Sequence, residues 1–200
     1  MKLVTYNIKN NARSRGKPWK GRRDEILSLI KDQDIMCLQE LTPWWVVWLR
    51  WKLRKTHRFH GRLFGTGTFV SRELRTIYSQ RVKLFDRWID VLRDFDRMRF
   101  VQHTIIRGDG YKFYSISNVH LGFNQELYEN VENLRKYLRI EDIKTTNLVI
   151  AGDFNVQYGT TKYNYLLNRF NVIDPNEGRY TTFHGWRNDP SREVTIDFTL

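Results

Sequence analysis

Short runs of apolar or alternating residues recur along the chain, and several of them end abruptly in polar residues. Runs of this kind predict strands, and polar residues at their ends indicate that separate strands bring side chains to one place. Four runs matter most: residues 3–6 before Asn7, 35–38 before Gln39 and Glu40, 111–119 before His120, and 148–151 before Gly152, Asp153, Phe154 and Asn155.

Two stretches with helical periodicity lie between these runs. In residues 22–31 most apolar side chains fall on one side, and in 125–140 they recur at 127, 131, 134 and 138, the spacing of a helix that packs on a sheet. Residues 69–107 add more β-rich pieces than a simple alternation of strand and helix would supply. We therefore predict an α+β fold in which two sheets form a β-sandwich flanked by helices.

Length and composition favour one domain over residues 1–200. The 200 residues with 40 % hydrophobic content are enough for a real core, and no repeat or Pro/Gly/Ser linker divides them. The single Cys37 lies in an apolar run and is expected to be a small buried hydrophobe. Neither a signal peptide nor an apolar run of membrane-spanning length is found, so we expect a cytoplasmic location. Composition says nothing of the oligomeric state.

Positive charge is in large excess, with 34 Lys and Arg residues against 22 Asp and Glu residues, a formal net charge of +12 and a pI near 9.9. This balance favours a polyanion as partner: DNA, RNA or an anionic membrane surface. Basic clusters at residues 17–23, 50–62 and 72–81 place cations near aromatic residues, as in proteins that contact a nucleic-acid backbone and stack on bases. We expect Lys17, Trp19 and Arg72 to bind substrate, with DNA favoured over RNA; an ordinary basic surface coat is the simpler alternative.

The polar strand ends offer oxygen ligands for a hard cation. Mg²⁺ keeps several waters and takes only one or two protein carboxylates, so Glu40 with Asn7 beside it is enough for a metal site. Such an ion would neutralise charge on the oxygens of a phosphodiester. Taken alone, Glu40 is more simply a solvated strand-end acid or a charge at a helix N-terminus, and Asn7 a residue that makes a turn.

The segment 152–155 carries more information because Asp153 and Asn155 stand two residues apart at the end of a buried strand. Both side chains can point to one side, with the carboxylate orienting a water and the amide donating to a phosphate oxygen. A plain Gly-Asp turn capped by Asn is the alternative. His120 could likewise donate to phosphate or be a structural histidine.

Taken together, these segments resemble the endonuclease/exonuclease/phosphatase superfamily, whose fold is that of deoxyribonuclease I. The resemblance spans nearly the whole chain, and its motifs occur in the family's order. They are Thr5-Tyr6-Asn7-Ile8, Cys37-Leu38-Gln39-Glu40, Gly67-Thr68-Phe69-Val70-Ser71-Arg72, Val119-His120-Leu121, Gly152-Asp153-Phe154-Asn155 and Thr195-Ile196-Asp197-Phe198.

The resemblance implies a role for each motif residue. Glu40 is then the principal Mg²⁺ ligand, with Mn²⁺ as a possible substitute, and Asn7 supports the metal site. Asp153 orients or activates the attacking water, while Asn155 and His120 stabilise the phosphoryl oxygens. In the family, the position of Asp197 orients a catalytic histidine within a Ser-Asp-His motif on a final strand. That motif does not occur before Leu200, so we expect the final strand to be missing here. Either the sequence is a truncated form of a longer enzyme, which we favour, or the natural protein lacks this strand and has reduced or no activity.

Residues 43–55 contain four tryptophans, and Trp44, Trp48 and Trp51 fall on one helical face. We expect this face to pack against a sheet as core. A stacking surface for unpaired bases and an interfacial membrane anchor are the alternatives.

The sequence therefore predicts a Mg²⁺-dependent phosphodiesterase that hydrolyses a nucleic-acid backbone through a metal-activated water. Two alternatives stay open: a phosphoesterase acting on phospholipid headgroups or phosphoinositides at a membrane surface, and a catalytically impaired nucleic-acid-binding paralogue. Whether cleavage is internal or from an end is also left open.

Overall fold

The computed structural model describes residues 1–8, 19–84, 99–140, 147–175 and 197–199. Its strands are β1 (Leu3–Asn7), β2 (Ile35–Leu41), β3 (His57–Gly61), β4 (Gly65–Ser71), β5 (Arg75–Lys83), β6 (Phe100–Arg107), β7 (Phe113–His120), β8 (Asn147–Asp153) and β9 (Asp197–Thr199). Its helices are α1 (Trp19–Ile30), α2 (Pro43–Lys52), α4 (Asn124–Ile140) and α5 (Thr161–Phe170), and a short 3-10 turn spans Asp109–Tyr111.

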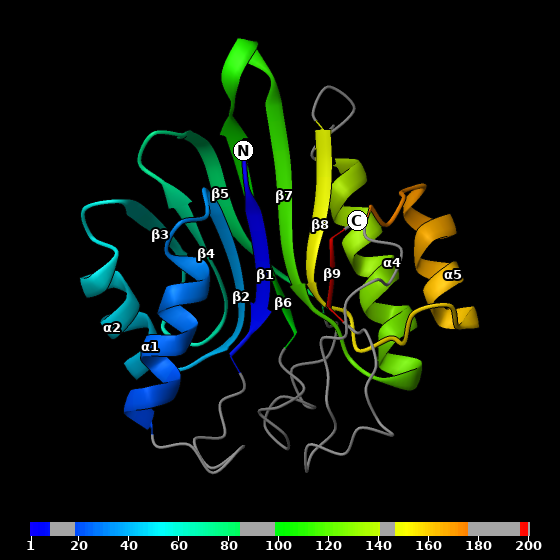
Figure 1. Cartoon of the computed structure of the whole chain (residues 1–200). Helices are drawn as coiled ribbons and strands as arrows, with labels where there is room; N and C mark the ends of the chain where they lie inside the picture. The colour runs from blue at the N-terminus through cyan, green and yellow to red at the C-terminus, as the bar shows by residue number, and fades with distance from the viewer. Residues whose placement is uncertain (9–18, 85–98, 141–146, 176–196, 200) are drawn as a thin grey trace.

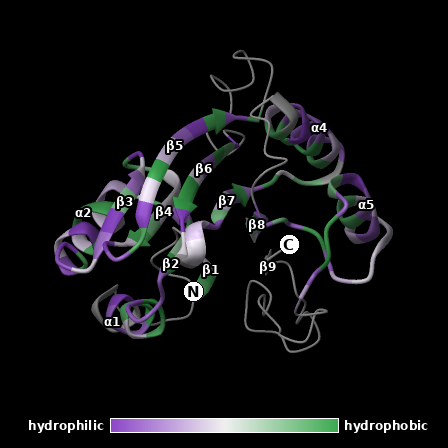
Figure 2. Ribbon diagram, turned by 90° about the horizontal axis from the view of Figure 1, so that it is seen from above, coloured by the Kyte–Doolittle hydropathy of each residue, from purple (hydrophilic) through white to green (hydrophobic). Residues whose placement is uncertain are grey.

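The strands form two sheets that pack face to face. One sheet has the order β1-β2-β4-β3, and the other has the order β5-β6-β7-β8-β9. Helices α1 and α2 cover the outer face of the first sheet, and α4 and α5 cover that of the second (Figures 1 and 2). The predicted α+β sandwich flanked by helices is confirmed.

Strand alternation sorts the side chains of each sheet into an inner and an outer set. In β2, Ile35 and Cys37 lie in the apolar layer between the sheets, whereas Met36 and Leu38 pack with α1 and α2. The second sheet follows the same rule, with inner positions such as Ile116 and Ala151 in the shared layer. An inner position near a strand end therefore faces the opposite sheet.

Helix α4 packs on the second sheet through the face that its periodicity predicts. Leu127, Val131, Leu134 and Leu138 are all buried, together with Phe154 and residues of α5. Helix α5 was not predicted from the pattern of residues 161–170. Cys37 is buried, as expected. None of the helices in the described part of the chain has the length and apolar character that a membrane crossing requires.

The prediction for the tryptophan-rich helix α2 is wrong. Its buried residues are Trp45, Val46 and Leu49, while Trp44 and Trp51 are exposed and Trp48 is only partly buried. Nearly every position of the helix is apolar, so periodicity does not mark the face that packs. The fold buries the side that carries Val46 and Leu49 and leaves two tryptophan rings outside.

Candidate active site

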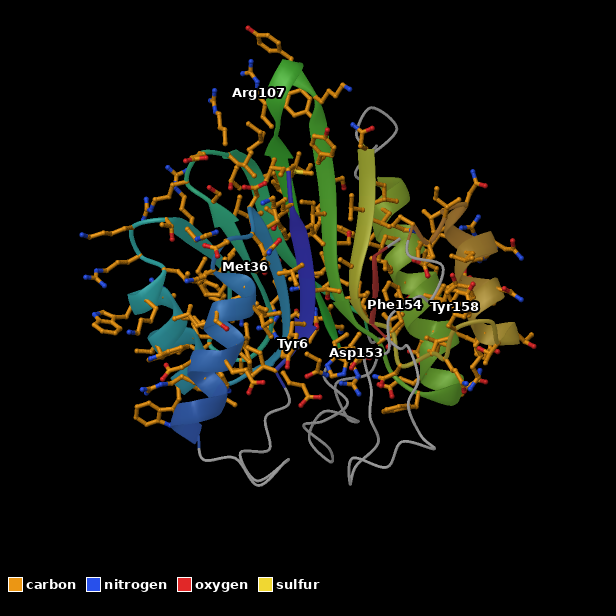
Figure 3. The ribbon with its side chains drawn as sticks, viewed as in Figure 1. Tyr6, Met36, Arg107, Asp153, Phe154 and Tyr158 are labelled. Carbon is orange, nitrogen blue, oxygen red and sulfur yellow. The ribbon has the colours of Figure 1, made fainter. Side chains whose placement is uncertain are left out.

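Three expected site residues lie on the inner faces of their strands, at the same end of the sandwich. Asn7 ends β1, His120 ends β7, and Asp153 ends β8, where it pairs in register with His120. Residues two apart in a strand lie on the same face of the sheet. The three side chains therefore share the inner face with Thr5, Asn118 and Ala151, which precede them by two residues. Figure 3 shows Asp153 and Tyr6, the neighbour of Asn7, at the lower end of the sheets. Strand alternation alone therefore turns these side chains toward one another.

Glu40 reaches the site through an irregularity in β2. Gln39 is an inner residue, so regular alternation would turn Glu40 outward, toward the helices. The register of β2 against β4 shifts between Leu38 and Leu41, and Glu40 has a φ of 54°. A bulge of this kind re-aims a side chain, and its left-handed backbone is costly for a residue other than glycine. The chain thus adopts a strained conformation where it delivers this carboxylate.

A single amide joins the two carboxylates of the site. Asn7 Nδ2 donates to Glu40 Oε1 at 2.9 Å and to Asp153 Oδ2 at 2.7 Å. Because ionised carboxylates can only accept, the amide nitrogen and not its oxygen must face them. The neutral amide holds two negative charges together without cancelling them. Glu40 comes from one sheet and Asp153 from the other, so the site bridges the sandwich.

His120 lies between Asp153 and Arg99. Its Nε2 is 3.7 Å from Asp153 Oδ2, and its Nδ1 is 3.5 Å from Arg99 Nη1. A guanidinium only donates, so Nδ1 accepts and the proton of a neutral imidazole sits on Nε2, toward the carboxylate. The side chains of Asp153 and His120 are only 4 % and 14 % exposed, so both are held at the edge of the interior.

Asn155 does more for Asp153 than the sequence suggests. It has a φ of 53°, and its backbone N–H donates to Asp153 Oδ1 at 2.9 Å. Its side-chain Nδ2 donates to the carbonyl oxygen of Leu121 at 2.7 Å. One amide N–H is therefore engaged with the backbone after β7, and the residue fixes the orientation of the carboxylate. Its expected role as a phosphate donor stays a prediction that rests on the other N–H.

A buried polar bridge joins the sheets directly beneath these residues. Gln39 Nε2 donates to Asn118 Oδ1 at 2.8 Å, and Asn118 Nδ2 donates to the carbonyl oxygen of Gly67 at 2.9 Å. Both side chains are fully buried, so the bridge is a strong constraint on how the sheets meet. Gln39 precedes Glu40, and Asn118 lies two residues before His120. The bridge therefore fixes the separation of the two halves of the site.

Of the three predicted substrate-binding residues, the structure describes the side chain of Arg72 alone, and it is not brought to this site. Arg72 follows β4 at the end where Val70 pairs with Ile35, and Glu40 lies at the opposite end of β2, roughly 17 Å away at about 3.3 Å per residue. Its Nε donates to the carbonyl oxygen of Arg54. Lys17 and the side chain of Trp19 lie outside the described residues.

Strand β9 places the backbone of Asp197 beside the site. Asp197 pairs in register with Asp153 across the antiparallel β8–β9 ladder. Its side chain lies outside the described residues, as do Thr195 and Ile196 of the same motif.

Two arginines near the site were missed because they carry no motif. Arg99 precedes β6, and its side chain is 13 % exposed, with Nε 4.0 Å from Glu126 Oε1. Arg81 lies with its guanidinium 3.8 Å from the centroid of the Phe100 ring. Burial, reinforced by the nearby positive charge of Arg62, lowers the pKa of Arg81 to about 10. Only the antiparallel registers of β5, β6 and β7 bring these cations to the end of the sheet where His120 lies.

The donor set fits a hard divalent cation. Glu40 and Asp153 supply carboxylate oxygens, and no cluster of three or more His, Cys, Asp or Glu side chains is found in the described part of the chain. Two carboxylates suit Mg²⁺, which takes one or two carboxylates and keeps water. Glu40, with Asp153 next to it, would hold the ion through carboxylate oxygens, and Asn7 would contribute only through Oδ1, because its Nδ2 faces the two carboxylates.

Comparisons with known proteins show the family and the fold. A model of the Endonuclease/Exonuclease/phosphatase family matches residues 4–200. An endonuclease/exonuclease/phosphatase structure from Bacteroides vulgatus superposes with a TM-score of 0.81 at 20 % identity, covering 99 % of this chain and 85 % of that one.

Two further structures show the same fold. A mannosyl-6-phosphatase from Bacteroides thetaiotaomicron has a TM-score of 0.79 at 18 % identity, covering 100 % of this chain and 84 % of that one. The human nocturnin catalytic domain with bound sulfate has a TM-score of 0.76 at 16 % identity, covering 100 % and 81 %. The search of curated proteins gives no significant match.

Proposed function

Because the chain belongs to the endonuclease/exonuclease/phosphatase family, we propose that it is a Mg²⁺-dependent phosphodiesterase that hydrolyses a nucleic-acid backbone. Members of the family are hydrolases of phosphoester bonds. The metal, the nucleic-acid substrate and the roles of the site residues are the parts that we add.

One observation supports this proposal most strongly: the Asn7 amide donates to both Glu40 and Asp153, which come from different sheets. Two carboxylates of separate strands are brought within reach of one substrate, with His120 and Arg99 beside them. Acids at these positions gain little for folding, because like charges held close together repel. Their convergence is therefore best explained by the chemistry of the site.

The side chains divide the work between water and phosphate. A divalent ion held by Glu40 and Asn7 would supply positive charge to the phosphoryl oxygens. Asp153, held by the backbone N–H of Asn155, accepts a hydrogen bond from the attacking water and aligns it. His120 Nε2 and the Arg99 guanidinium donate to the phosphoryl oxygens, where negative charge grows in the transition state.

Charge supports a nucleic acid as the substrate. A net charge of +12 attracts a polyanion from a distance and favours backbone contacts that do not depend on sequence. Arg99 and Arg81 add partly desolvated cations beside the strand ends. A small phosphoester carries only one or two negative charges and would engage little of this excess positive charge.

Cleavage of labelled single- and double-stranded oligonucleotides tests the proposal. We expect activity that requires Mg²⁺ and that E40Q and D153N each reduce by at least about a hundredfold. E73Q is the matched control, because Glu73 is an exposed acid beyond β4, at the opposite end of the sandwich. The proposal fails if the wild type binds oligonucleotides without cutting them in Mg²⁺, as a non-catalytic paralogue would, or if E40Q keeps full activity.

A phospholipid headgroup or phosphoinositide is the second candidate substrate. One observation favours it: Trp44 and Trp51 are exposed on α2, whose first residue lies three positions after Glu40. Turnover of phospholipid vesicles in place of oligonucleotides, with the same dependence on Glu40, would select it.

A further inference from the structure

The outermost line of helix α2 is apolar. Trp44, Val47 and Trp51 have 78 %, 57 % and 56 % of their surface exposed. They stand at i, i+3 and i+7, and therefore form one continuous stripe opposite the buried Val46 and Leu49. We call these three residues the α2 ridge. Two exposed tryptophans on one short helix are unusual, since these large side chains are normally mostly buried.

The ridge lies within a segment that carries only positive charge. Residues 41–72 contain no Asp or Glu, and they contain seven Lys or Arg residues: 50, 52, 54, 55, 58, 62 and 72. Arg50 and Lys52 are exposed on either side of the ridge, and Arg54 and Lys55 follow the helix. An apolar stripe with cations on both sides is complementary to a surface that is apolar inside and anionic outside.

An anionic lipid bilayer fits this surface better than a nucleic acid does. The ridge is a convex helix edge, whereas single strands are bound in grooves with open aromatic faces. Val47, at its centre, has no ring on which a base could stack. Cations already lie over the Trp51 ring, with Lys52 Nζ at 4.8 Å and Arg54 Cζ at 5.4 Å from its centroid. Tryptophan rings with flanking Lys and Arg are the side chains that favour the membrane–water boundary.

The same edge of the molecule carries a second pair of exposed apolar residues. Leu63 and Phe64 are exposed in the β3–β4 turn, and Gly65, the next residue, pairs with Leu41 just before α2. The start of the ridge and this turn therefore leave the sheet at neighbouring points, next to Glu40. A partner surface that contacted both the α2 ridge and this turn would lie alongside the candidate active site.

We propose that the α2 ridge docks this protein on an anionic phospholipid bilayer, with Trp44, Val47 and Trp51 entering the headgroup region and the flanking cations contacting the lipid phosphates. This docking goes beyond the proposed hydrolysis and does not depend on which phosphodiester is cut. It locates the enzyme at a membrane surface with its active site beside the lipid.

Vesicle sedimentation tests the docking. The wild type should bind vesicles containing phosphatidylserine and bind pure phosphatidylcholine vesicles much more weakly, with affinity that falls as salt rises. V47E and the W44A/W51A double variant should lower the partition coefficient by at least about tenfold. The matched control is I173E, because Ile173 is 79 % exposed just after α5, on the opposite flank of the sandwich.

A second measurement separates the outcomes. Anisotropy of a labelled single strand and its cleavage should be unchanged in V47E, which shows that the variant is folded and that docking and hydrolysis are separate properties. The proposal is overturned if V47E and I173E bind vesicles as the wild type does, or if no form binds anionic vesicles. It is also overturned if W44A/W51A loses oligonucleotide affinity and keeps vesicle binding, because the ridge is then a base-stacking surface.

Discussion

The conformation of Glu40 predicts that a glycine at this position is more stable than an alanine, which is the reverse of the usual order in a strand. E40G and E40A both remove the carboxylate and its hydrogen bond from Asn7, so their difference isolates the backbone. The φ of 54° is left-handed, which costs roughly 1–2 kcal/mol for a residue with a Cβ and nothing for glycine. Glycine loses more backbone entropy on folding than alanine, which offsets about 0.5–1 kcal/mol of this gain in stability. The free energy of unfolding of E40G should therefore be about 1 kcal/mol higher than that of E40A.

Urea unfolding followed by circular dichroism, with EDTA present so that no metal contributes, measures this difference. For a chain of 200 residues it corresponds to roughly 2–4 °C in Tm. Arg58 is the control, because it is an exposed residue with regular pairing within β3. At this position R58G should be less stable than R58A by roughly 0.5–1 kcal/mol. If E40A equals or exceeds E40G, Glu40 does not occupy the strained backbone, and the explanation of how it reaches the site is wrong.

Three further predictions concern the interior. Burial lowers the pKa of His103 to about 4 from 6.5, so between these pH values the unfolded chain binds a proton that the folded chain does not. The free energy of unfolding should therefore fall by up to about 3 kcal/mol as the pH drops through this window. In urea titrations H103Q should flatten this pH dependence, and an unchanged slope would contradict the assignment. Burial raises the pKa of the Cys37 thiol to about 12, so a thiol reagent at pH 8 should react only after unfolding, and rapid labelling of the native protein would contradict its burial. N118A should lower the free energy of unfolding by roughly 3 kcal/mol, since it leaves several buried groups unpaired, whereas N147A, at an exposed bond, should cost less than about 1 kcal/mol; equal losses would show that the inter-sheet bridge contributes little.

The predictable part of the site is the part that follows strand alternation. Asn7, His120 and Asp153 end apolar runs on the inner face, so residue pattern and motif order point to the same strand ends. Glu40 is a different case, because its motif identifies it while alternation turns it away. The bulge that redirects it depends on how β2 pairs with β4. Even their nearest partners, Leu41 and Gly65, are 24 residues apart, with α2 and β3 between them.

The parts that could not be predicted depend on tertiary contacts. Arg99 and Arg81 reach the site through strand register, which a single sequence does not reveal. Arg72 was assigned to the substrate from charge clustering, but charge along the sequence does not show at which end of a strand a residue lies. For α2, a helix that is apolar on all sides gives no indication of its buried face.

The most direct test of the central claim, that strand ends of two sheets form one metal and phosphate site, is a crystal structure of the protein soaked in Mn²⁺. We expect anomalous density in contact with the Glu40 carboxylate, on the side that faces Asp153, and its loss in crystals of E40Q. Anomalous density elsewhere that E40Q does not affect, or none at all beside Glu40 and Asp153, would contradict the account.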